Sequence, residues 1–128
     1  MAFASLQDAV LEAINQDRAR NGVGALSGSA QLSALASAWS RQVANTGSLS
    51  HQDPGLILGS PGYDEYRAFG ENVLVGSASL TAAQIEGTWM SSPEHRSNIL
   101  FPTFNIAGVG CVIGPDRRLW VVVDFGGA

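Results

Sequence analysis

The chain of 128 residues contains no lysine, and seven arginines stand against eleven acidic residues. The formal net charge is −4 and no basic run occurs, which argues against a nucleic-acid-binding protein. No stretch approaches the roughly 20 apolar residues of a membrane span. Charged residues make up only 14% of the chain and hydrophobic residues 45%, which excludes intrinsic disorder. We expect a monomeric globular protein with no nucleic-acid partner and no membrane span.

Cysteine is also scarce, because Cys111 is the only one and no intramolecular disulfide can form. Its apolar neighbours predict a buried strand, in which an unreactive thiol is favoured over a reactive one. We expect no signal peptide in this sequence, since Asp8 and Glu12 interrupt any apolar segment near its first residue. These observations leave two compartments open: the cytoplasm, or secretion after removal of a leader.

Two long helices are predicted in the first part of the chain. Residues 5–20 carry apolar side chains at helical spacing, with Ser5 in a capping position. Residues 29–46 carry a second apolar stripe, which Gly47 ends. The stripe residues are Phe3, Leu6, Val10, Leu11 and Ile14 in the first helix, and Leu32, Leu35, Ala36, Trp39 and Val43 in the second.

Glycine and proline punctuate residues 48–70, so no long regular element is expected there. A loop of this length inside a small domain is often functional. Within it, the apolar tripeptide of residues 56–58 (Leu56, Ile57 and Leu58) is expected to plug the core. The alternative is that these side chains contact the acyl chain of a lipid.

A third helix is predicted after Thr81, which forms a capping box with Gln84, and its Trp89 is expected to point inward. A short helix then begins at Ser92-Pro93 and ends between Asn98 and Leu100.

Valine-rich segments at 106–113 and 119–125 predict an antiparallel hairpin, and residues 73–75 are a candidate third strand. The two hairpin strands are apolar on nearly every residue, so both faces of the sheet are expected to be covered. We therefore predict one domain over residues 1–128. Its fold class is α+β, a three-layer α-β-α sandwich around a small, mainly antiparallel sheet.

His51 and His95 are the only two histidines, and Glu71 closes the long loop that follows His51. If that loop folds back over the sheet, two imidazoles and a carboxylate meet in one cleft. Such a set suits a borderline metal such as Zn²⁺ with an open position for water, or a metal-free proton relay. A purely structural role competes, in which Glu71 satisfies loop backbone donors and His95 bonds locally. Spacing alone favours that role slightly.

The ordered motifs resemble the CAP superfamily of cysteine-rich secretory proteins, antigen 5 and plant pathogenesis-related proteins, in its small bacterial form. The resemblance runs from about Leu6 to Gly126, and its joint order and spacing is specific. The residues that carry it are Asn15, Arg18, Leu26, Leu32, Ala36, His51, Gly70-Glu71-Asn72-Val73, Trp89, Ser92-Pro93-Glu94-His95-Arg96, Asn98-Ile99-Leu100, Gly108-Val109-Gly110 and Trp120 to Phe125.

The resemblance implies an α-β-α sandwich whose cleft is lined by His51, Glu71 and His95, with Asn72, Ser92 and Asn98 beside them. Larger eukaryotic relatives carry a second acid where this chain has Ser92, so the acidic tetrad is reduced to a triad. They also have Thr-Gln where this chain has Ser97-Asn98, which keeps an amide at that place. The family resemblance further implies divalent metal binding at the histidine pair, and sterol or fatty-acid binding in some members.

Three functions follow as hypotheses. The first is a secreted or envelope-associated binding module that holds a divalent metal, with Zn²⁺ as the candidate cofactor, or a small ligand. The second is a metal-assisted hydrolase, a peptidase or esterase, with Glu71 as the base. The third is a lipid or sterol carrier.

Overall fold

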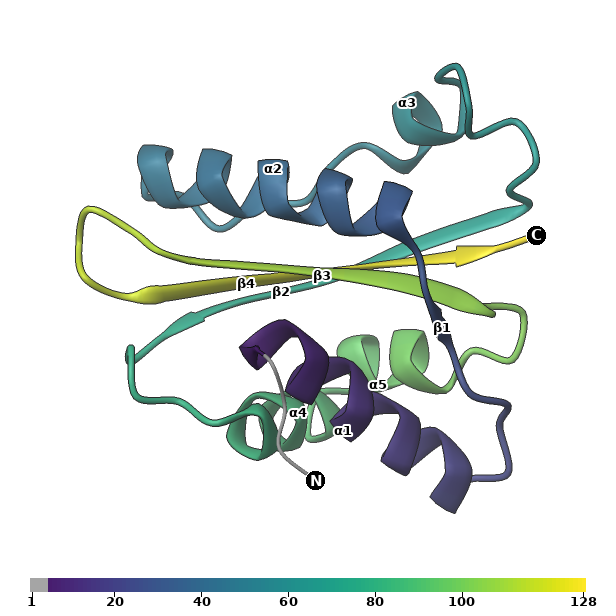
Figure 1. Ribbon diagram of the computed structural model, residues 1–128, viewed down its shortest axis with the longest axis horizontal. Coiled ribbons are helices and arrows are strands. Elements are labelled where there is room, and N and C mark those ends of the chain that lie inside the picture. The colour runs from purple at the N-terminus through teal and green to yellow at the C-terminus, as the bar shows by residue number, and fades with distance from the viewer. Residues whose placement is uncertain (1–4) are drawn as a thin grey trace.

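A central sheet separates two layers of helices in the computed structural model, which describes residues 5–128 (Figure 1). Helices α2 (Ala30–Thr46) and α3 (Pro54–Leu58) lie on one face, and α1 (Leu6–Arg20), α4 (Ala82–Met90) and α5 (Pro93–Leu100) lie on the other. The predicted α+β sandwich of three layers is confirmed. Phe3, which belongs to the predicted first stripe, lies outside the described residues.

The sheet has four strands in the order β1-β3-β4-β2. They are β1 (Ser27–Gly28), β2 (Ala68–Gly76), β3 (Ile106–Ile113) and β4 (Leu119–Gly127). The predicted hairpin is β3–β4, and all pairings are antiparallel except the short parallel contact of β1 with β3. Strand β2 extends well beyond the predicted residues 73–75, because it pairs with β4 along its whole length. Strand β1 was not predicted, because its two residues carry no strand pattern.

Local capping chemistry sets the helix starts. Ser5 accepts a hydrogen bond from the backbone N–H of Asp8, and Thr81 forms the predicted capping box with Gln84. Ser92 occupies the predicted N-cap position of α5, but its side chain makes no capping hydrogen bond. The start of α5 therefore rests on Pro93, whose fixed φ suits the first helical turn.

Strand β4 is buried along its entire length, because helices cover both faces of the sheet. Val121, Val123 and Phe125 pack into the main core with α1, α4 and α5, whereas Trp120 and Val122 pack on the α2 side.

Helix α2 lies so close to β3 that only glycine fits beneath it. A Cβ atom on Gly108 would lie 2.0 Å from the backbone nitrogen of Ser33, and one on Gly110 would lie 2.4 Å from the carbonyl carbon of Ala36. The Gly108-Val109-Gly110 motif is thus a packing requirement of the α2–β3 contact.

The expectation that residues 56–58 plug the core is wrong. These residues belong to the five-residue helix α3, in which no residue is buried, and Leu56 is 71% exposed. The physical reason is that α2 already fills this face of the sheet with Ala36, Val43 and their neighbours.

Cys111 lies half-buried in β3, and burial raises the pKa of its thiol, as expected of an unreactive cysteine. Among the helices within residues 5–128, none combines the length and apolar character needed to cross a membrane.

Candidate functional site

The candidate site lies at the outer strand of the sheet, β2, which pairs with β4 along one edge and with no other strand of residues 5–128. Side chains from the helical layer cover carbonyl groups of this strand. Asn98 Nδ2 donates to the carbonyl oxygen of Glu71 at 3.1 Å, and Trp89 Nε1 donates to that of Val73 at 3.2 Å. Helices α4 and α5 are thereby attached to β2, which protects the strand from pairing with another chain.

Successive residues of β2 face opposite layers, so Glu71 and Asn72 belong to different sides of the sheet. Asn72 is fully buried on the α5 side. Its Nδ2 donates to the carbonyl oxygen of His95 at 3.1 Å, and its Oδ1 accepts from Asn98 Nδ2 at 3.0 Å. The two predicted amides, Asn72 and Asn98, therefore position α5 and with it the backbone of His95.

Glu71 holds the start of the long loop against β2. Its Oε1 accepts from the backbone N–H of Gln52 at 3.0 Å and lies 3.1 Å from His51 Nδ1. Its Oε2 accepts from Gln52 Nε2 at 2.6 Å. The carboxylate is buried, whereas the side chain of His51 is 55% exposed. One side of the His51 ring is thus tethered and the rest is open to solvent.

Asp124 was not predicted as a site residue. It is the cross-strand partner of Glu71 and is fully buried, and its Oδ2 accepts from Gln52 Nε2 at 3.0 Å. Burial and the hydrogen bond and charge of Glu71 raise the pKa of Asp124 to about 10, so this carboxyl is protonated at neutral pH. The signal in the sequence was a lone acid at the end of the apolar run Val121-Val122-Val123.

Gln52 was also missed, because a glutamine in a polar loop carries no distinctive pattern. In the structure its amide nitrogen bridges Glu71 and Asp124. The site is therefore a network of two histidines, two acids and three amides rather than the predicted triad alone.

His95 approaches from α5, with its ring centroid 6.5 Å from that of Trp89. Burial lowers the pKa of His95, and the nearby charge of His51 lowers it further. The imidazole is therefore neutral at neutral pH. Ser92, at the N-cap of the same helix, makes no side-chain capping bond.

Within residues 5–128, no three histidine, cysteine or acidic side chains lie close enough together to hold a metal ion. The side chains that could hold a metal ion here are the two imidazoles of His51 and His95, and Glu71 contacts the ring of His51 from behind. The contacts of the ring of His51 with Glu71, and of the backbone of His95 with Asn72, bring both histidines to the same stretch of β2.

Comparison with known proteins assigns the chain to a family. The model of the cysteine-rich secretory protein family, CAP, matches residues 11–125. The chain belongs to the CAP family. This CAP domain is 33% identical over 118 residues to YkwD of Bacillus subtilis, an uncharacterized protein, and the match covers 87% of the chain and 44% of YkwD. The chain thus spans less than half the length of that curated relative.

Solved structures show the same fold. A Bacillus anthracis extracellular protein containing an SCP domain superposes with a TM-score of 0.75 at 24% identity, over 96% of this CAP domain and 40% of that chain. A cysteine-rich secretory protein from Staphylococcus aureus gives a TM-score of 0.76 at 20% identity, over 96% and 38% of the two chains. The likeness confirms the predicted fold class, and the family model confirms the predicted family.

Proposed function

We propose that this CAP domain is an extracellular binding module that holds a divalent transition-metal ion between His51 and His95. The compartment is inferred from the Bacillus anthracis and Staphylococcus aureus relatives, which are described as extracellular and secretory. Two imidazole nitrogens suit Zn²⁺ and similar borderline ions, and water or a small ligand would complete the coordination.

The observation that carries the proposal is the contact of His51 Nδ1 with Glu71 Oε1 at 3.1 Å. A carboxylate only accepts hydrogen bonds, so in neutral His51 the proton resides on Nδ1. Nε2 is then the unprotonated nitrogen, with its lone pair free. A carboxylate behind a histidine in this way orients the ring and makes it a better ligand.

The second ligand, His95, is prepared by its surroundings. Because burial lowers its pKa, His95 stays unprotonated at lower pH than a free imidazole does. A metal ion competes with protons for this nitrogen, so a lowered pKa extends the pH range of binding.

Binding is favoured over hydrolysis because of the state of Glu71. Its two oxygens accept hydrogen bonds from the backbone and side chain of Gln52, and the buried carboxyl of Asp124 lies on the neighbouring strand opposite it. A general base needs a free oxygen that reaches water. Glu71 is occupied as an acceptor, which suits the role of a positioning residue.

The test is Zn²⁺ titration by calorimetry at pH values of about 7.5 and 5.5 on the wild type, the His51→Ala/His95→Ala double variant and Glu71→Gln. We expect binding at the higher pH, weaker binding at the lower pH because protons compete with the metal ion for imidazole nitrogens, and no binding by the double variant. Glu71→Gln should weaken binding by about 10- to 100-fold, as loss of a carboxylate behind a ligand does.

Cys111→Ser is the matched control, because a thiolate is a strong Zn²⁺ ligand and Cys111 is the only cysteine of the chain. It should leave the isotherm unchanged. An isotherm that survives the double histidine variant would overturn the proposal.

A further inference from the structure

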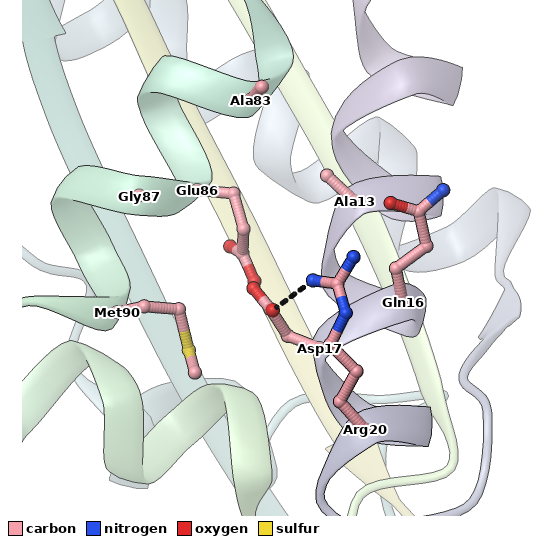
Figure 2. Close-up of a pocket in the computed structure, with 8 residues that line it drawn as sticks. All are labelled: Ala13, Gln16, Asp17, Arg20, Ala83, Glu86, Gly87 and Met90. Carbon is pink, nitrogen blue, oxygen red and sulfur yellow. Dashed lines mark hydrogen bonds and ion pairs between the residues drawn. The ribbon is translucent and has the colours of Figure 1, made fainter.

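A second cluster of acids lies on the other side of the molecule from α2, between α1 and α4. There a pocket of about 320 Å³ opens to solvent. Its lining residues are Ala13, Gln16, Asp17, Arg20, Ala83, Glu86, Gly87 and Met90 (Figure 2). The site described above shares none of them.

Glu86 is the unusual group in this pocket. It is only 3% exposed, and neither of its carboxyl oxygens accepts a hydrogen bond from any donor in the described residues. Figure 2 shows its carboxyl group turned across the pocket toward that of Asp17. Ionising a buried carboxyl that no donor reaches is costly, so only a ligand that brings both positive charge and donors would favour the ionised form.

Asp17 is partly satisfied, since Arg20 Nη1 lies 3.0 Å from its Oδ1 at the exposed rim. No such cation of residues 5–128 reaches Glu86. Burial raises the pKa of Glu86 to about 9. The neighbouring carboxyl of Asp17 raises it as well, because Asp17 repels a negative charge on Glu86 and can accept a hydrogen bond from the protonated form. The two carboxyls therefore hold a proton between them at neutral pH, and a cation with several donors can replace that proton.

The walls of the pocket indicate which cation. Ala13, Ala83 and Met90 are apolar, and a smaller hollow of about 140 Å³ shares Ala13 and Ala83 and continues past Ala9 and Ala82. Among residues 5–128 no three acidic, histidine or cysteine side chains lie together, so the pocket lacks the oxygen cage that Ca²⁺ takes, and a hydrated Mg²⁺ ion would make no use of the apolar walls. An ammonium group has three donors for the oxygens of Glu86 and Asp17, and its aliphatic stem fits against alanines.

We propose that the pocket between α1 and α4 binds a primary alkylammonium group, from a free amine or from a lysine side chain of another molecule. The chain contains no lysine of its own, so a lysine occupant cannot come from a second copy. Binding places the ammonium between Glu86 and Asp17 and releases one proton from Glu86 to the buffer.

The test is calorimetric titration of the full chain with n-butylammonium and with N-acetyl-lysine methylamide, in buffers of different ionisation enthalpy. We expect binding of at least one of the two, release of about one proton per ligand at neutral pH, and about tenfold higher affinity per pH unit up to about pH 9. The stronger of the two ligands identifies the source of the amine.

Glu86→Gln should weaken binding at least about tenfold and abolish proton release, because it removes the charge that receives the ammonium. Ala13→Leu, which fills the pocket without changing charge, should also abolish binding. Glu65→Gln is the matched control, since it removes an exposed acid of the loop, and it should bind like the wild type. Absence of binding by the wild type, equal binding by Glu86→Gln, or stronger binding of Mg²⁺ or ethylguanidinium would overturn the proposal.

Discussion

The carboxyl pair of Glu71 and Asp124 makes a definite prediction about stability and pH. In the folded protein the pKa of Asp124 is raised to about 10, whereas in the unfolded chain it returns to about 3.9. Between these values the folded state binds one proton more than the unfolded state. Raising the pH therefore lowers the free energy of unfolding, by about 1.4 kcal/mol per pH unit for one proton.

Asp124→Asn removes this titration with little change of shape. The amide that replaces the carboxyl has nearly the same size, and its oxygen can still accept from Gln52 Nε2, so the variant should fold. Glu86, with its pKa raised to about 9, contributes a second proton in the same direction and is unaffected by the change. Between about pH 7 and pH 8 the wild type should thus lose about 2.7 kcal/mol and Asp124→Asn only about 1.4 kcal/mol.

The measurement is urea unfolding followed by tryptophan fluorescence at intervals across this pH range, with a chelator present. The range lies above the region in which His95, with its lowered pKa, changes charge. Asp64→Asn is the control, because it removes the same group from an exposed position and should retain the wild-type slope. Equal slopes for the wild type and Asp124→Asn would refute the reasoning, since the slope depends only on the pKa lying above the range.

Two further predictions concern packing and are measured by the same urea unfolding. Arg18 is buried, and its guanidinium donates to four carbonyl oxygens, those of Gly24, Ile99, Phe101 and Phe104. Arg18→Met should therefore lower the free energy of unfolding by about 3–5 kcal/mol. Arg41 is exposed, and the control Arg41→Met should change that free energy by less than about 0.5 kcal/mol. Gly108→Ala should lower the free energy of unfolding by at least about 3 kcal/mol, because the new Cβ would collide with the backbone of α2. At Gly87 a Cβ would meet nothing within 4 Å, so Gly87→Ala should stabilise α4 by up to about 1 kcal/mol. A loss below about 1 kcal/mol for Arg18→Met or Gly108→Ala would contradict these contacts.

Part of the candidate site was predictable and part was not. His51, Glu71 and His95 stood out by residue type and by the family motifs. Their meeting was predicted only on the condition that the loop folds back, beside a structural role in which Glu71 accepts from loop backbone donors, and Glu71 contacts both His51 and the backbone of Gln52. Asp124 and Gln52 were missed because their role comes from pairing between β2 and β4 and from the path of the loop. Leu56 was wrongly predicted to be buried, because the sequence does not show that α2 already covers the face of the sheet on which Leu56 would have packed.

The sequence by itself determined the helices, the hairpin and the α+β class, because apolar periodicity, capping residues and valine-rich runs act over a few neighbouring residues. It also determined the family, through motifs whose order along the chain is specific. Only the tertiary structure decided that Asp124 faces Glu71, that Glu86 faces Asp17 and that Gly108 lies beneath α2. These contacts join segments far apart in the chain, so their burial and their shifted pKa values arise only when the layers pack together.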